Sequence, residues 1–181
     1  CSELELNPID YQCFFDRQFP IMNSGKNIPE KFKVKEGNFY ACGLSLVLHP
    51  TNPFVPTVHA NWRYFEMYDE AGNIVTQWFG GGQDLTPYYL FDEDAIHFHS
   101  ICKSACDRHN PMFYAKFKKV CDDYFWNSHR NEARGIGGLF FDYQKETEEF
   151  SIEDRFNFVT EVGCSFLDSY VPIVEKRQET P

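Results

Sequence analysis

Polar and apolar residues alternate most clearly over residues 56–66, which read PTVHANWRYFE. In a β-strand, successive side chains point to opposite faces of the sheet. One face of this strand would be apolar and carry Val58, Ala60, Trp62 and Tyr64. The other would carry a polar row of Thr57, His59, Asn61 and Arg63. The pattern therefore predicts a strand that covers a core on one side and presents polar groups on the other.

The rest of the pattern predicts an α/β (α+β) fold in a single domain over residues 1–181. Three more strands are predicted over residues 40–49, 74–79 and 135–143. Helices are predicted over 92–108, from 110 to about 134, and from 151 to about 170. The glycine-rich segment 80–87 is expected to end the third strand. Short connections between the first three strands favour a largely antiparallel sheet.

Composition and charge narrow the class of protein. The chain of 181 residues has a net charge of −10, which argues against a nucleic-acid partner. An anionic substrate would then need local positive charge from a few arginines. The seven cysteines form no C-x-x-C pair, so reduced thiols in a cytoplasmic setting are expected. No apolar run reaches the length of a membrane span.

The polar row of the central strand is the first candidate site. His59 supplies a titratable ring, Asn61 an amide, and Arg63 a fork-shaped anion binder. Pairing with strand 40–49 would bring Ser45 and His49 close to this row. Such a face suits an organic substrate with carboxylates, although a solvated sheet face would look the same.

Other residues extend the candidate chemistry. Asp84 follows three glycines and could accept hydrogen bonds from N–H groups of a substrate. Arg130 and Arg134 would be i, i+4 neighbours on a helix, so they are either solvent-exposed or share an anion, and Glu132 could neutralise one of them. Four histidines could form a divalent-metal cluster, but spacing gives no signature, so hydrogen-bonded histidines are the favoured alternative: His49, His59, His99 and His129.

Six motifs, in order, resemble those of the oxygen-dependent coproporphyrinogen III oxidase family. They are SLVLHP (45–50), PTVHANWRYFE (56–66), WFGGGQDLTPYY (78–89), HFH (97–99), FKKVCDDYF (117–125) and HRNEARGIGGLFFD (129–142). The resemblance covers about residues 39–176. Residues 1–38 do not match the family's N-terminal segments, and the family continues past its equivalent of residue 181.

The resemblance implies an enzyme of haem biosynthesis. Two propionates of coproporphyrinogen III would be oxidatively decarboxylated to vinyls, giving protoporphyrinogen IX. Oxygen would be the co-substrate, and CO2 and hydrogen peroxide would be released. No metal or organic cofactor would be required, and a divalent metal would be optional. The family implies a homodimer, a flat antiparallel sheet flanked by helices on both faces, and a cytoplasmic location, or the mitochondrial intermembrane space or a plastid in a eukaryote.

The resemblance also implies roles for single residues. His59 would be the proton donor, and Asp84 would hold pyrrole N–H groups. The substrate would be bound by Ser45, Asn61, Trp62, Arg63, Arg130 and Arg134. Metal ligands would be His49, His59, His99 and His129. Two alternatives stay open: a truncated, non-catalytic tetrapyrrole-binding homologue, and a histidine-cluster metalloprotein with unrelated oxidase chemistry.

Overall fold

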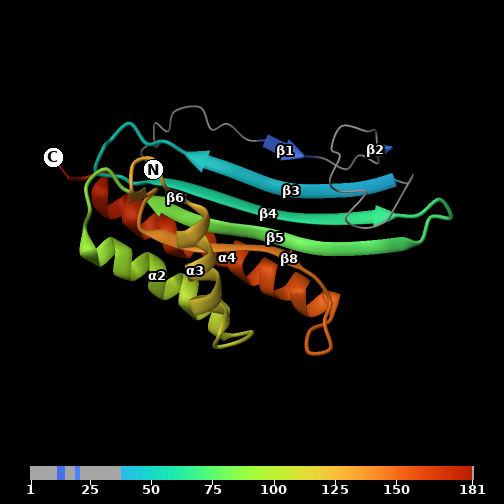
Figure 1. The fold of residues 1–181 in the computed structure, drawn as a ribbon. Helices are drawn as coiled ribbons and strands as arrows, with labels where there is room; N and C mark the ends of the chain where they lie inside the picture. The colour runs from blue at the N-terminus through green and yellow to red at the C-terminus, as the bar shows by residue number, and fades with distance from the viewer. Residues whose placement is uncertain (1–11, 15–18, 21–37, 181) are drawn as a thin grey trace.

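The computed structural model describes residues 12–14, 19–20 and 38–180, and its centre is an antiparallel sheet (Figure 1). Four long strands pair in the order β3 (Asn38–Leu48), β4 (Thr57–Tyr68), β5 (Ile74–Thr86) and β8 (Gly137–Gln144). Two short strands, β1 (Gln12–Phe14) and β2 (Phe19–Pro20), pair with the outer edge of β3. The helices are α2 (Asp92–Asp107), α3 (Phe113–Tyr124) and α4 (Ile152–Arg177).

The strand register divides the sheet into two chemically different faces. The face that packs on the helices, here the helix face, carries Val58, Ala60, Trp62, Tyr64, Phe79, Gln83, Leu85, Leu139 and Phe141. The opposite face, here the polar face, carries Gly43, Ser45, His59, Asn61, Arg63, Gly80, Gly82, Asp84, Gly138 and Asp142. The period-two pattern of β4 thus extends across all four long strands.

The core lies between the helix face and the three helices, which all lie on this side of the sheet in Figure 1. Phenylalanine rings fill much of it: Phe141 of β8 packs on Phe117 of α3 and on Phe158 of α4, with ring centroids 5.3 and 5.0 Å apart. The buried Arg177 side chain at the end of α4 pairs with Asp94 at the start of α2. Among the described residues, this packing covers the helix face of the sheet, and the three helices leave the polar face uncovered.

The predicted mixed fold, the antiparallel sheet and the presence and order of the three helices are confirmed. The last helix begins with a capping box formed by Ser151 and Asp154. Helices on the polar face are absent from the described ranges, so that part of the resemblance stays a prediction.

No described helix is long and apolar enough to cross a membrane. The thiols of Cys42, Cys102, Cys106, Cys121 and Cys164 are free, whereas the side chains of Cys1 and Cys13 lie outside the described part.

Two predicted boundaries are wrong. The segment 80–87 does not end the third strand, because β5 continues to Thr86. Its glycines allow neighbouring strands to come close: a Cβ on Gly81 would lie 2.5 Å from the Asn61 carbonyl oxygen, and a Cβ on Gly82 would lie 2.1 Å from that of Leu139. The glycine run thus serves strand packing and does not form a turn.

The second wrong boundary is the end of α3. This helix ends at Tyr124 and not near residue 134. A small hairpin of β6 (Trp126–Asn127) and β7 (Glu132–Ala133) follows, with Asn131 in the left-handed region at φ 53°. The hairpin returns the chain towards the sheet, where Arg134 meets Asp84. A tertiary ion pair therefore outweighs the helical pattern of this segment.

Candidate functional site

The strongest charge contact on the polar face joins Asp84 and Arg134. Arg134 donates from Nη2 and Nε to the two carboxylate oxygens of Asp84, at 2.6 and 3.1 Å. The Arg134 guanidinium also stacks over the Phe125 ring, 3.5 Å from its centroid. The Asp84 side chain is only 7% exposed, so this pair places a fixed, largely buried carboxylate at one end of the face.

His59 stands beside this pair. Its Nδ1 atom lies 3.5 Å from Asp84 Oδ2, and Nδ1 is buried without a hydrogen-bond partner among the described residues. Register pairing places His59 directly opposite Asp84 on β5. A small cavity of about 170 Å³ opens here, and Ser45 and Asn61 also line it. The imidazole can therefore exchange a proton with a group that enters this cavity.

Arg63 forms a second charged group further along β4. Its Nη1 donates to Asn61 Oδ1 at 2.9 Å, and its Nη2 lies 3.0 Å from Asp142 Oδ2 on β8. Gly80 makes room for this pair, because a Cβ there would lie 2.6 Å from Asp142 Oδ1 and 2.9 Å from Arg63 Nε. The guanidinium is partly exposed and can still receive an anion.

A larger cavity of about 490 Å³ lies beside Arg63 on the same face. Its far wall is a row of rings that crosses the four long strands, here the aromatic row: Phe39, Phe65, Trp78 and Tyr143. Neighbouring rings are 5.7, 4.3 and 5.1 Å apart between centroids. Ser45 and Asn61 line both cavities, so the two adjoin on the polar face, and together they are called the trough here.

The floor of this trough is unusually bare. Four positions of the polar face are glycines, one or two from each of three strands: Gly43, Gly80, Gly82 and Gly138. Arg63 lies between Gly43 and Gly80 in the register, and Asn61 lies opposite Gly82. The Arg63–Asp142 pair lies over Gly80, whereas Gly43 and Gly82 line the two cavities and let a ligand lie close to the backbone there.

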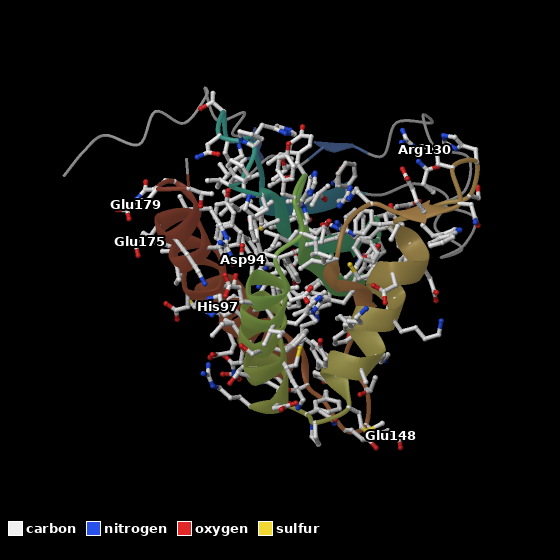
Figure 2. The ribbon with its side chains drawn as sticks, turned by 90° about the vertical axis from the view of Figure 1, so that its left-hand side faces the viewer. Asp94, His97, Arg130, Glu148, Glu175 and Glu179 are labelled. Carbon is white, nitrogen blue, oxygen red and sulfur yellow. The ribbon has the colours of Figure 1, made fainter. Side chains whose placement is uncertain are left out.

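Two predicted site residues do not lie on the polar face. Trp62 points to the helix face and packs against Phe166, with ring centroids 5.7 Å apart. Arg130 is in the turn between β6 and β7, where it is exposed and pairs with Glu132 at 2.6 Å. Figure 2 shows Arg130 at the outer edge of the molecule, away from the sheet. The expectation that Glu132 neutralises one arginine is confirmed, whereas the i, i+4 helical pairing of Arg130 and Arg134 is wrong.

The described structure does not assemble the four predicted metal ligands. The rings of His49 and His59 are 6.5 Å apart between centroids, but His99 lies in the helix layer. There His99 Nε2 donates to the Ile136 carbonyl oxygen at 2.9 Å, and Nδ1 accepts from the Tyr114 hydroxyl at 3.1 Å. Burial lowers the pKa of His99. Across residues 38–180, no three His, Cys, Asp or Glu side chains form a metal-binding group, so this donor set does not fit a metal.

The sequence reasoning missed Asp142 and the aromatic row. The period-two pattern contained the signal, because Phe65 continues the polar row of β4 and Asp142 follows Phe140 by two residues. Trp78 could be placed only with the correct strand register, which puts it opposite Phe65. Pairing across four strands was needed to see that these residues share one trough.

Comparison with known proteins identifies the family of this chain. The model of the family "Coproporphyrinogen III oxidase" matches residues 20–181. An oxygen-dependent coproporphyrinogen-III oxidase from Francisella tularensis subsp. holarctica (strain OSU18) is 55% identical over 141 residues, which is 78% of this chain. One from Francisella philomiragia subsp. philomiragia is 54% identical over the same length. The matched region spans 44% of each of these relatives. The chain therefore belongs to the coproporphyrinogen III oxidase family.

Proposed function

We propose that this chain carries the substrate trough of an oxygen-dependent coproporphyrinogen III oxidase. The observation that carries the proposal is the polar face itself. It combines a bare glycine floor, two arginines and the His59–Asp84 pair in one trough. Membership of the family and the names of the relatives support this substrate.

A tetrapyrrole with propionate side chains suits the trough. The macrocycle is broad, carries carboxylates at its rim and has N–H groups at its centre. Arg63 and Arg134 would bind propionates, because a guanidinium fork matches a carboxylate. Asp84 would accept pyrrole N–H bonds with the lone pairs that Arg134 leaves unused, since each carboxylate oxygen has two. Ser45 and Asn61 would add hydrogen bonds along the trough.

We propose that His59 supplies a proton to the reaction. At each reacting propionate, the bond to the carboxyl carbon breaks and CO2 leaves. A hydride equivalent leaves the neighbouring carbon, and the vinyl double bond forms between the two carbons. Oxygen takes up that hydride together with one proton, which gives hydrogen peroxide. A histidine beside an aspartate can act as a general acid and deliver this proton.

The remaining implications of the resemblance are proposals as well. Since the relatives are longer than the matched region, decarboxylation by the whole protein, its homodimer and its cytoplasmic location are expectations drawn from the family. Trp62 and Arg130 would act on the substrate only indirectly, because neither side chain lies in the trough.

Aerobic turnover of coproporphyrinogen III tests the proposal. Product is oxidised and measured as protoporphyrin fluorescence, and His59→Ala is compared with His97→Ala. His97 is a matched control, because it bonds the Asp168 carbonyl oxygen on the helix layer, far from the trough. We expect turnover in the wild type and in His97→Ala, and a loss of about 100-fold or more in His59→Ala.

Two other outcomes are informative. Binding of the porphyrinogen without turnover would favour the non-catalytic tetrapyrrole-binding homologue. Equal turnover in both histidine variants would refute the proton-donor role of His59.

A further inference from the structure

Asp142 holds a fixed negative charge inside the larger cavity of the trough. Its Oδ2 atom pairs with Arg63 Nη2 at 3.0 Å, and its Oδ1 atom accepts the backbone N–H of Tyr143 at 2.9 Å. The carboxylate is therefore anchored to its own strand as well as to Arg63. It lies above Gly80 beside the Arg63 guanidinium, and the Asp142 side chain is 32% exposed, so a ligand in the cavity can approach it.

The positive charges of the polar face are already balanced. Arg63 pairs with Asp142, and Arg134 pairs with Asp84. Lys145 lies near the Trp78 ring, 5.3 Å from its centroid, and donates to Thr76. Apart from Arg63, the described lining of the larger cavity holds no cation. A carboxylate bound at Arg63 shares its cation with Asp142, and a second carboxylate in this cavity would meet Asp142 and the aromatic row.

We propose that Asp142 is a specificity-determining residue that limits how many carboxylates the trough accepts. This inference rests on the proposed function. At the aromatic end, the favoured occupant is a macrocycle edge whose pyrroles carry one propionate and one uncharged methyl group. A tetrapyrrole with an acetate in place of each methyl group would bring an extra carboxylate next to Asp142.

The size of the effect follows from like-charge repulsion. Two carboxylates about 5 Å apart weaken binding about fourfold at the dielectric constant of water, and more at a partly buried site. Asp142→Asn removes this charge but keeps the size of the side chain and an oxygen that can accept the Tyr143 N–H. A purely steric selection would therefore survive the substitution, whereas an electrostatic one would not.

The test measures dissociation constants of coproporphyrin III, with four carboxylates, and uroporphyrin III, with eight, by fluorescence titration. The wild type is compared with Asp142→Asn and with Asp107→Asn. Asp107 is a matched control, because it pairs with Lys103 on the exposed surface of α2 and its loss changes the net charge equally. We expect Asp142→Asn to tighten uroporphyrin binding at least fourfold more than it tightens coproporphyrin binding, because the propionate next to Arg63 is common to both ligands. Asp107→Asn should change neither by more than twofold.

Three outcomes would overturn the inference. The ratio of the two dissociation constants could be the same in Asp142→Asn and wild type, or could change equally in Asp107→Asn. Asp142→Asn could also weaken the binding of both ligands, which would make Asp142 a positioning residue for Arg63. In each of these cases, coproporphyrin binding by the wild type leaves the proposed function standing. If the wild type binds neither porphyrin, the proposed function fails, and this inference fails with it.

Discussion

The Asp84–Arg134 pair fixes the end of the trough beside His59, and a double-mutant cycle measures how strongly the two side chains are coupled. The three variants are Asp84→Asn, Arg134→Gln and the double variant. Arg134 contacts both oxygens of Asp84, at 2.6 and 3.1 Å, and the Asp84 side chain is 7% exposed against 34% for Arg134. The two single substitutions are therefore not equivalent, because they leave differently exposed partners behind.

The burial of the side chain left behind determines how much each substitution should lower the free energy of unfolding. Arg134→Gln leaves a largely buried carboxylate without its cation and should lower the free energy of unfolding by about 3 kcal/mol. Asp84→Asn leaves a guanidinium that water can reach and that still stacks on Phe125, so about 1 to 2 kcal/mol is expected. The double variant should lower the free energy of unfolding by about 3 kcal/mol. The sum of the two single losses exceeds this by about 1 to 2 kcal/mol, which is the expected coupling energy.

Urea unfolding followed by tryptophan fluorescence gives these free energies. Because the two side chains touch, their effects should not add, and the double variant should be clearly more stable than the sum of the single losses predicts. Additive losses, with a coupling energy below about 0.5 kcal/mol, would refute the claim that this pair fixes the site.

Two further predictions concern the helix layer and the trough floor. Burial lowers the pKa of His99, so the unfolded chain takes up this proton at a higher pH than the native state does. The free energy of unfolding should therefore fall as the pH drops below about 6.5, and urea unfolding at pH 7.5 and 5.5 should show a smaller difference in His99→Gln. Gly80→Ala would place its Cβ 2.6 Å from Asp142 Oδ1 and 2.9 Å from Arg63 Nε. Because both atoms belong to side-chain ends that can move, the free energy of unfolding should change by less than about 1 kcal/mol. Fluorescence titration should show clearly weaker porphyrin binding in this variant. An unchanged dissociation constant would contradict the geometry.

Local pattern was enough to find the polar face. The alternation in residues 56–66 predicted the strand and its polar row, and the register confirms that Ser45 lies opposite Asn61. Antiparallel pairing followed from short connections alone. These features depend on neighbouring residues and on a period of two, which a single sequence contains.

Features that depend on contacts between distant segments were not predicted. Glycine signals a turn by its conformational freedom, but Gly82 is required because Leu139 of another strand comes close. The segment after Tyr124 has helical spacing, but the ion pair of Arg134 with Asp84, 50 residues away in sequence, favours a hairpin. Likewise, nothing local indicated that His99 is held by Ile136 and Tyr114 and kept away from the other histidines.

Equilibrium binding of coproporphyrinogen III without oxygen tests the central claim, that the polar face is the substrate trough, most directly. Arg63→Gln is compared with Arg108→Gln, which removes the same charge from the exposed partner of Glu161 on the helix surface. We predict that Arg63→Gln weakens binding at least about tenfold, as expected for the loss of a charged hydrogen bond to a propionate, and that Arg108→Gln stays within about twofold of the wild type. Equal affinity in the two variants would contradict the account and move the substrate to another part of the molecule.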